Sequence, residues 1–358
     1  MDSISQIVLG AAVGEAVLGK KLGNKAMVWG AIGGTIPDLD VLASPIISKL
    51  QALAFHRGIT HSIFFDIVGG IFFGWLVYKL YDYRHSRMNT KKNVSLKEWS
   101  WLFFWTFFTH ALLDCFTMFG TQLFAPFSDY RVAFSTIAVV DFFYTIPFIT
   151  CLIIASRHAR GSNQRRKWNW RGIMWSCFYL LLTFCNKLYV TEVYKTQLAD
   201  QNISYDSMVV GPTIMTNFLW TATMDSNVSG QIKAGDKDVF YIGQYSIFDK
   251  SPIEFLEVRK NKYLLGEYKP DDKTIETLDW FTSGFINVMN RKDCGLQMND
   301  LRFGTFTGKA DDENDFIFRF PIQKNYQGYF ELEKVGKGPA SGNRKEMMRD
   351  IWERIKGR

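Results

Sequence analysis

The first 195 residues alternate between long apolar stretches and short polar loops. Apolar stretches close to the roughly 20 residues that cross a bilayer are typical of membrane-spanning helices. Glycines and Pro37 break the second stretch, which we interpret as an interrupted helix. The pattern predicts a membrane all-α helical bundle of about five to six spans, one of them interrupted, over residues 1–195. The stretches are residues 4–19, 26–48, 58–80, 99–124, 134–155 and 172–190.

From about residue 200 the apolar runs become short and alternate with polar positions, which is typical of half-buried strands. The charged stretch 343–356 predicts a terminal helix, and no catalytic motif stands out in this half. We therefore predict a small β-rich or α+β soluble domain over residues 200–358. The expected strands lie in residues 213–223, 238–248, 301–307 and 315–320.

The basic residues are distributed like those of a membrane protein. The net charge is +7, and many Lys and Arg side chains lie in two loops, residues 81–98 and 156–171. Short loops rich in Lys and Arg are typically cytoplasmic. The bilayer is therefore the expected partner and nucleic acid is not, and the C-terminal domain is predicted to be extracytoplasmic.

The apolar half contains six side chains of the kinds that bind metals. A charged side chain at the bilayer centre costs about 2.5–3.5 kcal/mol on insertion scales, so such residues need partners. A shared divalent cation is the simplest partner. No cysteine pair has the CxxC spacing, so a thiolate site is not indicated. The six residues are Asp38, Asp40, His56, His61, His110 and Asp114.

The spacing of these residues suggests how they meet. His110 and Asp114 are four apart and share one helix face, where they can bind one ion or simply hydrogen-bond to each other. His56 and His61 flank Gly58, which suggests a turn that leads both rings into one cavity. Imidazole with carboxylate suits zinc first, with manganese or iron as alternatives, and one or two ions are feasible.

Other candidates have two interpretations each. Of Asp38 and Asp40, one is expected to bind the metal while the other orients a histidine, although the pair could equally cap a helix. Arg57 is either a phosphate clamp or a snorkelling interfacial arginine. Asp141, in an apolar setting, is either a ligand or general base, or a hydrogen-bond partner within the membrane.

Three elements together resemble a known family. They are Pro37-Asp38-Leu39-Asp40, His56-Arg57-Gly58-Ile59-Thr60-His61-Ser62, and His110 followed by Asp114, Thr117, Gly120 and Pro126. This set is similar to the YdjM-like family of membrane-bound, metal-dependent hydrolases of bacterial inner membranes. The resemblance covers residues 1–150 and implies an inner-membrane protein with a hydrolase-type metal site on these His and Asp positions.

The same elements are more distantly similar to zinc-dependent phospholipase C and the P1-type nucleases, which implies phosphoester hydrolysis. Members of these groups often carry a histidine near the N-terminus, where this chain has Gln6, so Glu15 is a possible replacement ligand.

These inferences lead to one main functional hypothesis. A metal-dependent hydrolase would cleave a phosphoester of a lipid or lipid-linked substrate. Asp40 or Asp141 would take a proton and Arg57 would steady the phosphate. The metal ligands would be Asp38, His56, His61, His110 and Asp114. The alternatives are a non-catalytic protein that binds or carries a divalent cation, and a purely structural role. The sequence indicates neither the individual substrate nor the oligomeric state.

Overall fold

The computed structural model describes residues 1–88, 94–213, 215–226, 238–305, 308–333, 336–337 and 344–357. The chain divides into two compact units. The helical unit comprises Met1–Ile46, Phe55–Phe184 and Ile214–Thr216. The sheet unit comprises Ile47–Ala54, Cys185–Thr213 and Asn217–Arg358. The division into a membrane domain over residues 1–195 and an extracytoplasmic soluble domain over residues 200–358 stays a prediction.

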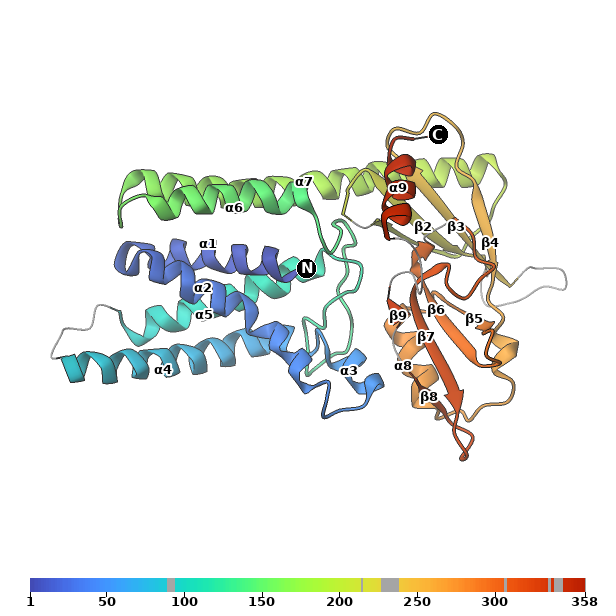
Figure 1. Ribbon diagram of the computed structural model, residues 1–358, viewed down its shortest axis with the longest axis horizontal. Coiled ribbons are helices and arrows are strands. Elements are labelled where there is room, and N and C mark those ends of the chain that lie inside the picture. Colours follow the sequence, from blue (N-terminus) through green and yellow to red (C-terminus); the bar gives the residue numbers. More distant parts are fainter. Residues whose placement is uncertain are drawn as a thin grey trace. The chain divides into compact units, whose positions relative to one another are not determined.

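The helical unit begins with a tight helical hairpin (Figure 1). Helix α1 (Ser3–Leu22) starts at Asp2, whose side chain accepts hydrogen bonds from the first-turn amides, and ends at Gly23. Helix α2 (Asn24–Thr35) then runs back along α1. The two backbones touch through glycines, since a Cβ on Gly14 would clash with the Ala26 carbonyl oxygen. Close packing of this kind fixes where α2 ends, which is where the candidate site begins.

A second helical pair packs beside the hairpin. Helix α4 (Ile63–Met88) and helix α5 (Leu96–Cys115) contact each other through Gly70 and Gly74, which lie against the α5 backbone at Phe104 and Ser100. A capping box of Ser95 and Glu98 starts α5. Buried aromatic rings fill the space between these helices and the hairpin, among them Trp99, Phe103 and Phe107.

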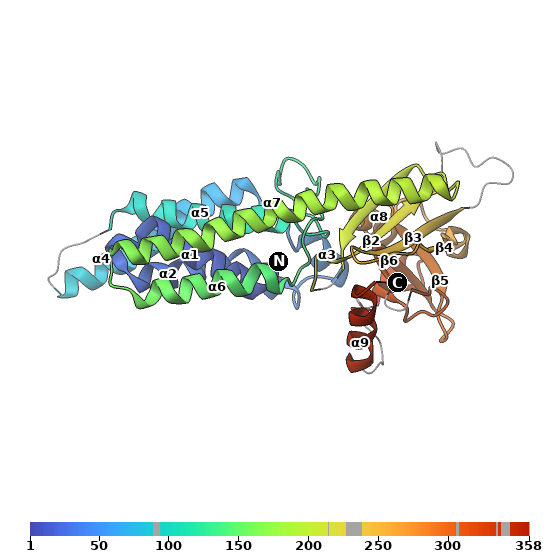
Figure 2. The ribbon, with the colours of Figure 1, turned by 90° about the horizontal axis from the view of Figure 1, so that it is seen from above.

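Helix α6 (Phe142–Arg157) and the first part of helix α7 (Asn163–Asp200) run side by side in both views (Figures 1 and 2). Tyr144 of α6 bonds to Ser176 of α7 at 2.8 Å between their hydroxyl oxygens. Residues of α1, α5, α6 and α7 share one apolar cluster, which includes Val8, Leu113 and Phe148. Short helices complete the connections, namely η1 (Pro37–Ala43), α3 (Lys49–Phe55) and η2 (Ile59–His61).

The prediction of five to six membrane spans is wrong. Among the described residues, two helices are long and apolar enough to cross a membrane, Ile63–Tyr81 within α4 and Asn163–Asp200. Apolar sequence alone misled the prediction because it did not show where the helices stop. Helix α2 has 12 residues and ends at Thr35, well inside the run 26–48. The run 134–155 is irregular up to Asp141, and helix α6 has 16 residues.

The sheet unit contains a four-stranded antiparallel sheet in the order β1-β2-β3-β4. The last part of α7 packs on it, and the Tyr194 hydroxyl donates to the carbonyl oxygens of Trp220 and Gly243, both at 3.0 Å. The strands are β1 (Ser207–Pro212), β2 (Leu219–Asp225), β3 (Val239–Ser246) and β4 (Phe255–Arg259).

A second antiparallel sheet has the order β5-β6-β7-β8, with β9 also paired to β7. Thr223 of β2 donates to the Leu301 carbonyl of β6 at 2.7 Å, which ties the two sheets together. The remaining elements are η3 (Lys262–Leu265), α8 (Lys273–Thr282), β5 (Ile286–Asn290), β6 (Leu296–Thr305), β7 (Phe316–Lys324), β8 (Phe330–Leu332), β9 (Gly336–Lys337) and α9 (Arg344–Ile355).

The prediction of a β-rich C-terminal domain agrees with the two antiparallel sheets. Strands β3 and β7 lie within the predicted stretches 238–248 and 315–320, apart from the last residues of β7. The stretch 301–307 coincides with the end of β6, although its residues 306–307 lie outside the described part of the chain. The predicted terminal helix corresponds to α9.

Candidate metal centre

Four side chains from three elements of the helical unit converge on one point. Asp38 comes from η1, His61 from η2, and His110 and Asp114 from α5. One potential ligand atom from each lies within 4.8 Å of all the others. His110 and Asp114 meet because residues four apart share a helix face.

Local structure explains how Asp38 arrives there. Helix α2 ends at Thr35, and Pro37 takes the first position of the 3-10 helix η1, where a missing amide proton has no cost. With about three residues per turn, positions two apart point in different directions. Asp38 therefore joins the four-residue cluster while Asp40 contacts the residues behind it.

The two histidine rings face each other through their Nε2 atoms, which are 3.2 Å apart. His110 Nδ1 lies 2.7 Å from the carbonyl oxygen of Gly34, which only accepts, so Nδ1 carries the proton. Thr60 donates its hydroxyl proton to Asp40, which leaves the Thr60 oxygen as acceptor for His61 Nδ1 at 3.1 Å. In their neutral forms both rings therefore direct an Nε2 lone pair toward the same point.

The carboxylates add further acceptors at that point. Asp38 Oδ1 lies 3.3 Å from His61 Nε2 and 3.5 Å from His110 Nε2. Asp114 Oδ2 lies 3.6 Å from His61 Nε2. Two imidazole lone pairs and two carboxylate oxygens repel one another unless a cation lies among them.

Asp114 contains the clearest sign of a missing partner. Its Oδ1 accepts from the Gln6 amide at 2.9 Å and from the amino group of Met1. Its Oδ2 is buried and accepts no hydrogen bond from any described residue, although Arg57 Nε lies 3.1 Å away in an ion pair. Buried polar atoms in native proteins are usually satisfied, and a cation would satisfy this one.

Burial and charge set the protonation that a metal site needs. Burial lowers the pKa of His61 to about 4, so its ring is neutral at pH 7. Burial alone would raise the pKa of Asp114, but the Arg57 guanidinium beside it holds that pKa well below its usual range. Neutral imidazole and ionised carboxylate are the forms that bind metals. The residues present therefore fit a divalent cation.

Two further predicted site residues lie next to the cluster and not in it. Asp40 Oδ1 lies 2.9 Å from His56 Nδ1, and its Oδ2 accepts from Thr60 at 3.1 Å. Asp40 Oδ2 is also 3.8 Å from His61 Nδ1, which places Asp40 behind a cluster histidine. His56, predicted as a ligand, lies outside the four-residue cluster, with its ring centre 6.0 Å from that of His61.

Arg57 is buried and lies beside the cluster. Its backbone has a φ of 61°, in the left-handed region, and its amide donates to Asp40 Oδ2 at 3.2 Å. Its guanidinium donates to the Thr117 hydroxyl at 2.6 Å and lies over the Phe119 ring. With these partners and Asp114, the buried Arg57 guanidinium does not snorkel, and its role as a phosphate clamp stays a prediction.

Asp141 lies away from the cluster, at the start of α6. It accepts from the amides of Phe143 and Tyr144 at 2.9 and 3.1 Å, and from the Tyr179 hydroxyl at 2.9 Å. Burial raises the pKa of this carboxyl. Of the two interpretations from the sequence, these contacts match a hydrogen-bond partner.

Glu15 and Gln6 occupy different places. Glu15 forms two hydrogen bonds of 2.6 Å with Arg165, and it lies outside the cluster. Gln6 contacts Asp114 directly, and its Oε1 is buried without a hydrogen-bond partner among the described residues. The supporting contacts of Gly34, Thr60 and Thr117 were not predicted. Thr60 and Thr117 belong to the quoted motifs but were given no role, and a backbone carbonyl such as that of Gly34 gives no signal in the sequence.

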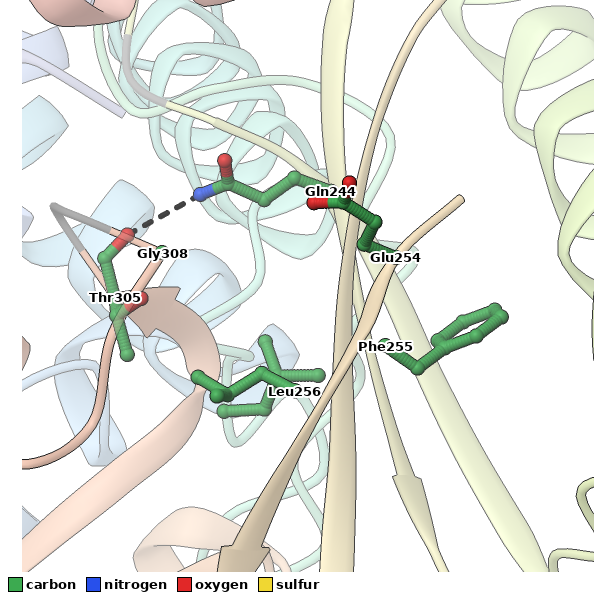
Figure 3. Close-up of a pocket in the computed structure, with 7 residues that line it drawn as sticks. Gln244, Glu254, Phe255, Leu256, Thr305 and Gly308 are labelled. Atoms are coloured by element: carbon green, nitrogen blue, oxygen red, sulfur yellow. Dashed lines mark hydrogen bonds between the residues drawn. The ribbon is translucent and has the colours of Figure 1, made fainter. Parts of the chain in front are cut away.

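A second pocket lies in the sheet unit (Figure 3). Its volume is about 200 Å³, and it lies between β3, β4 and the end of β6. The Gln244 amide donates across it to the Thr305 carbonyl at 3.2 Å. None of the metal-ligand groups found among the described residues lies there, so we assign it no role.

The first half of the chain matches a known protein family. A family model described as YdjM inner membrane protein matches residues 1–190, more than half of the 358 residues. The chain belongs to the YdjM inner membrane protein family. Membership indicates a protein of the bacterial inner membrane, and the YdjM region contains all four cluster residues.

A curated relative adds no activity to the YdjM assignment. The Uncharacterized protein YfhP of Bacillus subtilis (strain 168) is 25% identical over 227 residues, which are 60% of this chain and 62% of YfhP. The chain thus spans less than two thirds of the length of this relative. No solved structure matches this chain. Hydrolysis and the similarity to phospholipase C and P1-type nucleases therefore stay predictions.

Proposed function

We propose that this protein is a metal-dependent hydrolase of the inner membrane that cleaves a phosphoester of a lipid or lipid-linked substrate. The observation that carries the proposal is the convergence of Asp38, His61, His110 and Asp114 within 4.8 Å. Two imidazoles and two carboxylates suit zinc, and also manganese or iron. A bound divalent ion would polarise a phosphoryl oxygen and lower the pKa of a water molecule.

Two side chains at the candidate site are exposed to solvent. The His61, His110 and Asp114 side chains are at most 1% exposed, whereas Asp38 is 27% exposed and His56 is 42% exposed. Asp38 and His56 therefore form the mouth of the site.

His56 and Asp40 form a proton-transfer pair at this mouth. Asp40 accepts from His56 Nδ1, which leaves His56 Nε2 as the basic nitrogen of the neutral ring. Imidazole is the side chain that exchanges protons most readily near pH 7. We assign the proton transfer to His56, with Asp40 as its positioning residue. Arg57 holds Asp114 through the 3.1 Å ion pair and offsets its charge.

The surface beside the mouth is apolar, which supports a lipid substrate. Leu39, Val41 and Leu42 of η1 are each at least half exposed, and Leu39 directly follows Asp38 in the chain. Large apolar side chains gathered on a surface typically mark an interaction site. A phosphoester at the mouth would place its hydrocarbon chain against these residues.

The mouth is proposed to face the extracytoplasmic side. The first candidate span ends at Tyr81, and the second begins at Asn163. Lys and Arg residues follow Tyr81 and lie on both sides of Asn163. Positive-inside orientation puts these two ends in the cytoplasm. His61 precedes the first span at its other end, and the sequence after Asp200 follows the second span. Both would then be extracytoplasmic.

The test uses purified full-length protein in detergent. Its metal content and its release of phosphate or headgroup from a panel of phosphodiesters and phospholipids are measured together, with and without chelator. The proposal expects chelator-sensitive turnover that His110→Ala abolishes and His158→Ala leaves intact. Fully metal-loaded protein that cleaves no member of the panel, but moves divalent ions across proteoliposomes, would replace the hydrolase by the carrier.

A further inference from the structure

An apolar groove of about 370 Å³ runs between α4 and α5 on the outer surface of the helical unit. Its volume falls in the range of roughly 300–1,000 Å³ that is typical of small-molecule sites. Lys97 is the one charged residue among those that line it. The groove is lined by Ile67, Ile71, Lys97, Ser100, Trp101 and Phe104.

The groove lies on a different face from the candidate metal centre. Trp101 and His110 are nine residues apart on α5, which is two and a half helical turns and therefore opposite faces. Trp101 is 45% exposed and His110 is 1% exposed, as this geometry requires. A ligand in the groove would thus not be the substrate of the metal centre.

The position of Lys97 along the helices matches the surface of a membrane. Gly70 lies against Phe104 and Gly74 lies against Ser100, so α4 and α5 are antiparallel. Continuing this register places Lys97 about one turn from Tyr81, where the candidate span ends. Lys97 therefore lies at the level where lipid headgroups meet water, and Trp101 lies just below it, as aromatic residues often do.

The charges of the two helices favour a lipid over a second copy of the chain. A second copy of the chain seated here would have to offer Lys97 an acidic side chain that is exposed and not already paired. Among the acidic residues of α4 and α5 whose side chains the structure describes, Asp66 and Asp114 are buried and Glu98 pairs with Lys21 at 2.8 Å. A lipid phosphate supplies the missing negative charge.

We propose that this groove binds an anionic phospholipid of the membrane. One acyl chain lies between Ile67, Ile71 and Phe104, and the lipid phosphate pairs with the Lys97 ammonium group. The apolar groove binds the acyl chain, and Lys97 makes the site selective for lipids with an anionic headgroup. This inference is independent of the proposed hydrolase activity.

The experiment measures lipid binding by the full-length protein. Detergent-solubilised protein is titrated with phosphatidylglycerol or with phosphatidylcholine, and bound lipid is counted by native mass spectrometry. Lys97→Gln should weaken phosphatidylglycerol binding about fivefold, because one basic residue at a membrane surface contributes about that factor, and should not change phosphatidylcholine binding. Ile71→Trp should block the groove to both lipids.

Two matched controls separate the groove from general effects. Lys79→Gln removes an exposed lysine of α4 that does not line the groove, and Leu80→Trp adds bulk at an exposed position outside it. Both should bind lipid like the wild-type protein. Equal phosphatidylglycerol binding by Lys97→Gln and the wild type would overturn the proposal. So would an Ile71→Cys protein that crosslinks to a second copy, since that outcome makes the groove a dimer interface.

Discussion

His56 Nδ1 lies 2.9 Å from Asp40 Oδ1, and the same carboxylate approaches His61 Nδ1 through its other oxygen at 3.8 Å. One acid thus contacts a histidine inside the four-residue cluster and a histidine at its mouth. Hydrogen bonds to the second nitrogen of an imidazole fix its tautomer and raise its basicity. Of the two sequence expectations for Asp40, a base or an orienting residue, this geometry favours the orienting residue.

Replacing His56 should reduce turnover without removing the metal. We expect His56→Ala to lower kcat by about 10²-fold or more, the usual contribution of a positioned acid or base, with KM little changed. Asp40→Asn should lower activity by about 10–100-fold. Wild-type kcat in His56→Ala would remove His56 from proton transfer.

Metal content provides a test that does not depend on the substrate. His61→Ala and Asp114→Ala each delete one of the four converging ligands, so bound metal should fall to background after purification. His158→Ala is the matched control, since His158 follows α6 and lies outside the cluster. Elemental analysis of the three proteins and the wild type decides the question. Wild-type metal content in Asp114→Ala would refute the proposed centre.

Sequence reasoning found the residues that form the cluster, but it did not show which of the neighbouring candidates lie outside it. The i, i+4 spacing of His110 and Asp114 depends only on helix geometry, so it could be predicted. The direction of His56 could not, because it depends on the turn at Arg57, whose φ of 61° is unusual for a residue other than glycine. That turn separates His56 from the cluster that His61 joins.

The membrane spans, and the place of Asp141 within one of them, were predicted wrongly for a related reason. Apolar residues also fill irregular segments that pack against helices, and hydropathy does not distinguish the two. The stretch 116–140 is irregular, so Asp141 begins a helix instead of lying within one. The β-rich C-terminal half was easier, because alternation with period two depends on the local backbone alone.

Removing the Asp141 carboxylate should affect stability and leave chemistry intact. Asp141→Ala deletes the cap of α6 and leaves the Tyr179 hydroxyl buried without this acceptor. Losing a helix cap costs about 0.5–2 kcal/mol, and an unsatisfied buried group costs about 1–3 kcal/mol. Thermal unfolding should therefore shift down, while metal content and turnover per folded molecule stay unchanged. Tyr179→Phe should produce a smaller shift. If Asp141→Ala lost turnover without losing stability, Asp141 would instead have a catalytic role.

The orientation of the chain can be tested without any ligand. Lys and Arg residues gather after Tyr81 and around Asn163, so the ends of the two candidate spans that carry them should be cytoplasmic. A fluorescent reporter that matures only in the cytoplasm should be dark when fused after Arg358, and a phosphatase reporter that needs the oxidising exterior should be active there. A fusion within the predicted loop 81–98 is the internal control and should give the opposite pair of signals. A cytoplasmic signal after Arg358 would instead place the mouth of the metal centre, with Asp38 and His56, toward the cytosol, where soluble phosphoesters become the substrates to test.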